Sequence, residues 1–127
     1  MPVRCVLKLG NPQLSLRSAE IDDFHSEHIV NLVKDLQDTM AHYGGAGIAA
    51  PQIGVSKRLI IFGFDVNPRY PEAPPVPVTI LANPVFEPLT EVMVAGMEGC
   101  LSIPSIRGSV LRFRKIKYSG YDLVLLL

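Results

Sequence analysis

Hydrophobic and polar residues alternate along this chain with two different periods, and these periods predict one helix and several strands. Between residues 29 and 43 the apolar positions recur every three or four residues, as on one face of an α-helix. The positions are Ile29, Leu32, Val33, Leu36, Met40 and Tyr43. Asp22 or Asp23 is suited to cap the start of this helix, and Gly44-Gly45 to stop it. We therefore expect a helix that buries this face.

The other apolar runs have the character of strands. Residues 58–64 (RLIIFGF) are β-branched at their centre, and residues 78–84 and 90–96 form two more such runs. In residues 110–122 the alternation slips between Arg114 and Lys115, which favours a strand pair or a bulged strand. Residues 65–77 carry five prolines and predict a stiff surface loop. The pattern predicts the α+β class, with an N-terminal helix packed on mainly antiparallel sheets.

Length and composition are those of one globular domain over residues 1–127. The 12 basic and 12 acidic side chains balance, so the overall charge argues against a nucleic-acid or membrane partner. No run is long enough to cross a membrane, and the N-terminus has no signal-peptide apolar region, so we expect an intracellular chain. In such a compartment Cys5 and Cys100 are expected to stay unpaired.

Residues 45–54 (GAGIAAPQIG) contain almost nothing that packs a core or exchanges protons. Glycine serves where the backbone needs unusual dihedrals or close approach, and Gln52 is the only side chain here with amide donors. The stretch is suited to an exposed backbone groove on which an extended peptide adds strand-like hydrogen bonds. The alternative is a plain glycine-rich loop that follows a helix.

Residues 98–102 (EGCLS) place Cys100 between a glycine and a leucine, directly after a predicted strand. A cysteine in this setting serves as a nucleophile, a metal ligand or a small buried hydrophobe, and the residue alone does not decide among them.

Taken together and in this order, the two stretches resemble the first two signature motifs of the peptide deformylases. The resemblance extends to the segments VLKLGNPQL, LANP and SIPSIRG and so covers essentially the whole chain. It implies a deformylase-like α+β fold and the hydrolytic removal of the formyl group from the N-terminal formylmethionine of new proteins. The implied partners are nascent formyl-Met peptides and the ribosome, with no membrane and no specific nucleic acid. The implied location is the bacterial cytoplasm or an organelle.

The resemblance also implies roles for particular residues. Cys100 matches the metal ligand of the family, whose native ion is Fe²⁺, with Zn²⁺, Ni²⁺ or Co²⁺ as substitutes. Gln52 and the backbone N–H of Leu101 match the two donors to the formyl oxygen, an oxyanion site. The implied substrate-binding residues are Gly45, Ala46, Gly47, Ile48, Glu98 and Gly99. Arg107 matches an arginine that pairs with Glu98 and braces the site.

The third family motif, HExxH, does not occur in these 127 residues. It supplies two histidine ligands and the general base on a C-terminal helix. We therefore expect a sequence truncated before this helix, with an incomplete metal site and no turnover by this polypeptide alone. His25 and His28, three residues apart, are the alternative ligands, although such histidines are more often exposed on a helix.

Two further functions remain open at this point. One is a deformylase-like protein that binds N-terminal peptides without cleaving them. The other is a basic module that faces RNA through a cluster in residues 107–117, namely Arg107, Arg112, Arg114, Lys115 and Lys117. A solvated strand face explains the same cluster, because the overall charge is balanced.

Overall fold

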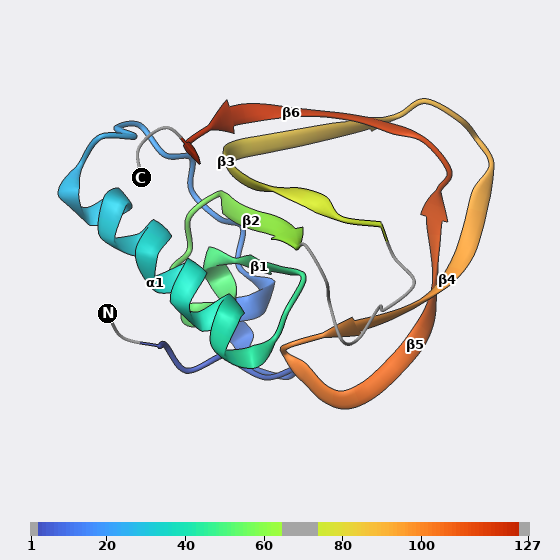
Figure 1. The fold of residues 1–127 in the computed structure, drawn as a ribbon, viewed down its shortest axis with the longest axis horizontal. Coiled ribbons are helices and arrows are strands. Elements are labelled where there is room, and N and C mark those ends of the chain that lie inside the picture. The colour runs from blue at the N-terminus through green and yellow to red at the C-terminus, as the bar shows by residue number, and fades with distance from the viewer. Residues whose placement is uncertain (1–2, 65–73, 125–127) are drawn as a thin grey trace.

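A computed structural model describes residues 3–64 and 74–124, and it contains one α-helix and two antiparallel sheets (Figure 1). The predicted proline-rich loop and the last leucines lie largely outside the described residues. The first sheet has the strand order β1-β2-β3-β6, and the second is the hairpin β4-β5. In chain order the elements are η1 (Pro12–Ser15), α1 (Glu27–Tyr43), β1 (Gly47–Ala49), η2 (Ala50–Ile53), β2 (Leu59–Phe64), β3 (Val76–Pro88), β4 (Met93–Cys100), β5 (Ile103–Phe113) and β6 (Ile116–Asp122). The expected α+β class is confirmed.

The helix α1 forms where the periodicity predicts it, but its cap differs from the prediction. The side chain of Ser26 accepts a hydrogen bond from the N–H of Ile29 and caps the helix, whereas Asp23 accepts from His25 in the turn before it. Gly44 ends the helix in the left-handed conformation, with φ of 65°. Four of the predicted apolar positions are buried and Met40 packs partly buried against them, whereas Tyr43 in the last turn is exposed.

The core lies between α1 and the first sheet. Val33 and Leu36 of the helix meet Leu59 and Ile61 of β2 and Ile80 of β3, and all five are almost completely buried. Burial alternates along β2, as expected for a strand with one face on a core. In the part of the chain that the structure describes, no helix is long and apolar enough to cross a membrane.

The predicted slip near Arg114 is a change of sheet. The strand β5 ends at Phe113 and pairs with β4, whereas β6 begins at Ile116 and pairs with β3. The hairpin β4-β5 thus leaves the first sheet and the chain returns to it through β6 (Figure 1). This excursion carries Cys100 to the end of β4.

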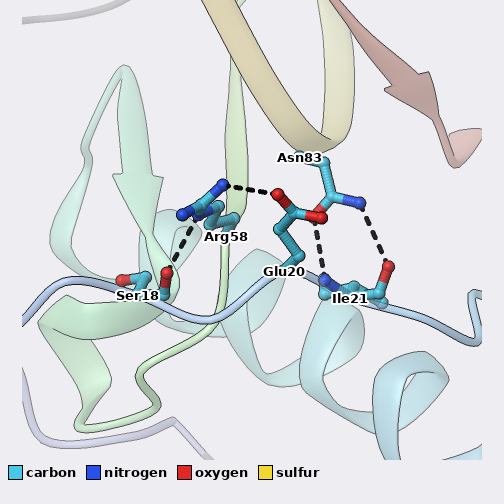
Figure 2. Close-up of polar contacts among 5 residues, drawn as sticks. All are labelled: Ser18, Glu20, Ile21, Arg58 and Asn83. Carbon is cyan, nitrogen blue, oxygen red and sulfur yellow. Dashed lines mark hydrogen bonds and ion pairs between the residues drawn. The ribbon is translucent and has the colours of Figure 1, made fainter.

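The segment before α1 is fastened to the first sheet by two polar side chains (Figure 2). The Asn83 amide accepts from the N–H of Ile21 at 2.8 Å and donates to its carbonyl at 3.0 Å, like a neighbouring strand. The Arg58 guanidinium donates to the carbonyl of Ser18 at 2.9 Å and pairs with Glu20 at 3.0 Å. These contacts fix where α1 begins relative to the sheet.

Candidate active site

Two segments that are far apart in the sequence meet in one small pocket of about 110 Å³. The side-chain nitrogen Nε2 of Gln52, in η2, lies 3.7 Å from Sγ of Cys100, at the end of β4. The pocket is lined by Gly45, Ala46, Gly47, Gln52, Gly99, Cys100 and Leu101. The expected convergence of Gln52 and Cys100 is therefore present in the structure.

Gln52 is held by its local backbone. Pro51 stands in the first turn of the short helix η2, where its missing N–H leaves no hydrogen bond unmade, and Gly54 ends the helix with φ of 83°. The amide oxygen Oε1 of Gln52 accepts the N–H of Ala49 at 2.9 Å. The NH₂ end of the amide consequently faces Cys100 and Ser102.

Cys100 is an exposed residue at the end of β4, where a tight turn to β5 begins. The register shifts after Gly99, and Cys100 then pairs with Ile103, so that Leu101 and Ser102 form the turn. Cys5 and Cys100 are both unpaired, as expected for these cysteines. An exposed thiol beside an amide N–H agrees with a reactive or ligating cysteine better than with a buried hydrophobe.

Two of the glycines that line the pocket, Gly45 and Gly47, are small for a reason that the sequence did not indicate. A Cβ on Gly45 would lie 2.9 Å from the side chain of Leu101, and a Cβ on Gly47 would lie 3.2 Å from the carbonyl oxygen of Ile61. The space beside each glycine is thus filled by the protein itself. These residues bring β1 close to β2 and to the Cys100 turn, and any peptide must approach from another side.

The strand β1 nonetheless has one open side, because it is the edge of the first sheet. The carbonyl of Ala46 accepts the N–H of Gly63, next to the paired part of β2. Since hydrogen bonding alternates along an antiparallel ladder, Gly47 directs its own N–H and C=O away from β2. An extended chain is able to pair with this edge beside the pocket.

The expected pair between Arg107 and Glu98 is wrong, and the structure pairs Glu98 with Arg112 instead. The Arg112 guanidinium makes two hydrogen bonds to the Glu98 carboxylate, at 2.7 and 2.9 Å. Glu98 stands opposite Gly108 and Gly99 opposite Arg107, so the alternation of the strands places Arg107 on the other face of the hairpin. Arg107 donates to the carbonyl of Met97 at 3.5 Å.

The bidentate pair is expected to stabilise the protein only above acidic pH. The hydrogen bonds from Arg112 lower the pKa of Glu98, against a smaller opposing effect of burial. Because its pKa is lowered in the folded state, ionised Glu98 stabilises the folded protein at pH values above its unfolded-state pKa of about 4.3. This stabilisation is lost as the pH falls through the pKa of Glu98 in the folded state. Because the Glu98 side chain is 38% exposed, we expect at most about 1 kcal/mol.

Urea unfolding of the Arg112→Gln variant tests this expectation. The variant should be less stable than the unmodified chain at pH 7, and the difference should shrink as the pH falls below about 4.3. Arg114→Gln is the matched control, since no ion pair of Arg114 is found among the described residues. A difference that persists unchanged at pH 3 would contradict the assignment.

Of the described residues that line this pocket, Cys100 carries a side chain of a type that binds transition metals in proteins. No group of three or more His, Cys, Asp or Glu side chains suited to a metal ion occurs within residues 3–64 and 74–124. His28 lies in the first turn of α1 and lines a different pocket, with Asp22, Asp23 and Lys57, and no histidine is among the described residues that line the pocket of Cys100. Catalytic sites normally use three protein ligands, so the described residues by themselves do not fit a complete metal site.

Sequence reasoning missed two residues next to the pocket. Ser102 has no role in the family resemblance, but its Oγ accepts a hydrogen bond from Nε2 of Gln52 at 3.1 Å. Arg112 was assigned only to a basic cluster, and it is neutralised by Glu98. In the register of β4 and β5, Glu98 stands opposite Gly108 and Val94 opposite Arg112, so Glu98 and Arg112 lie on the same face of the hairpin. The sequence indicates this pair only when that register is known.

An exposed cysteine thiol thus lies beside an oriented side-chain amide, next to a strand edge that can pair with an extended peptide. Comparison with known proteins gives the family. The family model described as polypeptide deformylase matches residues 3–125. The chain therefore belongs to the peptide deformylase family, metal-dependent hydrolases that remove the formyl group from the N-terminal formylmethionine of nascent proteins.

Individual relatives agree with this assignment. Peptide deformylase 1 of Bordetella pertussis is 52% identical over 120 residues, which are 94% of this chain and 68% of that protein. Peptide deformylase 1 of Nitrosomonas europaea is 50% identical over 120 residues, with the same two coverages. The Met-Ala-Ser-bound crystal structure of a class I type b peptide deformylase from Acinetobacter baumannii superposes with a TM-score of 0.89 at 37% identity, over 96% of this chain and 78% of that one.

Proposed function

We propose that the pocket between η2 and the Cys100 turn receives the formyl end of a nascent peptide. In this proposal the NH₂ group of Gln52 and the backbone N–H of Leu101 donate hydrogen bonds to the formyl oxygen, and Cys100 is a ligand of the catalytic metal. The observation that carries the proposal is the 3.7 Å separation between Nε2 of Gln52 and Sγ of Cys100. Two donors aimed at one oxygen stabilise the negative charge that develops there during hydrolysis.

The remaining residues of the pocket would hold the peptide main chain. Gly45, Ala46 and Gly47 line the pocket at the start of β1, and Gly99 lines it from β4. Ile48 was also expected to bind substrate, but it is buried and pairs with Ile61, so its contribution would be to hold β1 in place. An extended peptide would add a strand at this edge, which binds its backbone without regard to sequence. Glu98, paired with Arg112, would fix the β4 side of the pocket.

Iron(II) is the metal that we propose, with zinc, nickel or cobalt as substitutes. A single thiolate does not hold a catalytic divalent ion, so turnover requires ligands beyond those that the described residues supply. The substrate is a newly made chain, and we propose that the protein acts in the cytoplasm or an organelle, near the ribosome. A role in binding without catalysis is not favoured, since relatives that are about 50% identical are named peptide deformylases.

The 127-residue polypeptide should bind formyl-Met-Ala-Ser and show no turnover with iron(II) or nickel(II) under anaerobic conditions. Binding is measured by NMR titration with formyl-Met-Ala-Ser and, for comparison, with unformylated Met-Ala-Ser. Turnover is measured by the release of formate. Addition in trans of a helical segment that carries HExxH should give turnover, because this segment would supply further metal ligands and a base. The restored activity should be absent in the Cys100→Ala variant.

Two results would contradict the proposal. Equal affinity for formylated and unformylated peptide would mean that the pocket does not bind the formyl group. Metal-dependent turnover by the polypeptide alone, lost in Cys100→Ala, would show that other residues of the chain complete the metal site; the variants His25→Ala and His28→Ala would identify them.

A further inference from the structure

The side-chain amide of Gln52 has a defined orientation because both of its ends are engaged. Its oxygen accepts the N–H of Ala49 at 2.9 Å, and a rotation of the amide by 180° would bring two donors face to face there. Its nitrogen donates to Oγ of Ser102 at 3.1 Å. Nε2 carries two hydrogens, and its second N–H donates to Sγ of Cys100 at 3.7 Å, a long contact with a weak acceptor.

Ser102 is well placed to orient this amide. It is buried, with 6% of its surface exposed, in the turn that follows Cys100. Its carbonyl accepts the N–H of Leu9 at 2.9 Å, and the carbonyl of Gln52 accepts the N–H of Leu7 at 2.7 Å. One extended N-terminal segment thus holds the backbones of both Gln52 and Ser102. The hydrogen bond between their side chains therefore joins two residues whose backbones are held in place.

We propose that Ser102 is a positioning residue for the deformylase site. Its hydroxyl oxygen accepts one N–H of Gln52 and thereby directs the other N–H toward the place of the formyl oxygen beside Cys100. The identity of the ligand rests on the proposed function above. The orientation of the amide is a property of the two side chains, so it is measurable without a metal or a substrate.

The test compares the 127-residue chain with Ser102→Ala, Ser102→Thr and the control Ser109→Ala, an exposed serine on β5. NMR resolves the side-chain amide of Gln52, which is assigned by its disappearance in Gln52→Glu. We expect its protons to exchange with solvent about 3- to 10-fold faster in Ser102→Ala, as for the loss of one neutral hydrogen bond. Ser102→Thr should restore slow exchange, and Ser109→Ala should leave it unchanged.

Peptide binding gives the second measurement. Affinity for formyl-Met-Ala-Ser should fall about 3- to 10-fold in Ser102→Ala, while affinity for Met-Ala-Ser stays the same. Unchanged amide exchange in Ser102→Ala would overturn the proposal. If that variant does not fold, Ser102→Cys replaces it, because sulfur is a weak acceptor, and exchange as slow as in the unmodified chain would overturn the proposal equally.

The two proposals fail in different ways. Altered amide exchange in Ser102→Ala, together with no preference of the unmodified chain for formylated peptide, would support the positioning role and contradict the proposed function. A formyl preference that survives in Ser102→Ala, with unchanged exchange, would support the function and overturn the positioning role.

Discussion

The Gln52→Glu variant should lose at least about tenfold in affinity for formyl-Met-Ala-Ser while it keeps its fold. Glutamate has nearly the same shape as glutamine, so one carboxylate oxygen can still accept the N–H of Ala49. The other oxygen replaces the Nε2 donor, and the Ser102 hydroxyl is able to donate to it. The formyl oxygen would then meet a negative charge where a donor had been. NMR titration with formylated and unformylated peptide measures the loss.

Gln13→Glu is the control for this variant. Gln13 is exposed and is not among the residues that line the pocket, so the same change of charge should leave both affinities unaltered. An unchanged preference for formylated peptide in Gln52→Glu would show that the side chain does not contact the formyl group. The assignment of the oxyanion donors would then be wrong.

The Gly63→Ala variant should lose about 4 kcal/mol of unfolding free energy. Gly63 has φ of 132°, a conformation that L side chains rarely adopt, at an irregularity in the pairing of β2 with β3. A Cβ there would lie 2.5 Å from the carbonyl oxygen of Pro77 and 2.6 Å from Cα of Val78. These are backbone atoms of a paired strand, so β3 would have to move. Chemical unfolding followed by circular dichroism measures the change.

Gly96→Ala is the matched control, because a Cβ on Gly96 meets no atom within 4 Å and its φ lies in the ordinary range. That variant should change stability by less than about 1 kcal/mol. Equal stability of Gly63→Ala and Gly96→Ala would contradict the close approach of β2 to β3. Because the N–H of Gly63 also donates to Ala46, the Gly63 variant should in addition weaken peptide binding at β1.

Some of the site could be predicted from the sequence and some could not. The convergence of Gln52 and Cys100 was expected only from the family resemblance of two motifs, because no local pattern relates residues that are 48 positions apart. The partner of Glu98 was assigned to Arg107 by resemblance, but the register of β4 and β5 gives it to Arg112. Ser102 had no visible role until the turn after Cys100 brought its hydroxyl to Gln52.

The helix and most strands were determined locally. The spacing of Ile29, Leu32, Val33 and Leu36 decides which helix face is buried, because side chains within a few turns share one surface. The slip at Arg114 likewise marked the end of β5. Only the tertiary structure decided which strands pair and in which register. It also decided why Gly45 and Gly47 must be small. Those features depend on contacts between segments that are distant in the sequence, such as the side chain of Leu101 beside Gly45. Such contacts form only when the whole chain has packed.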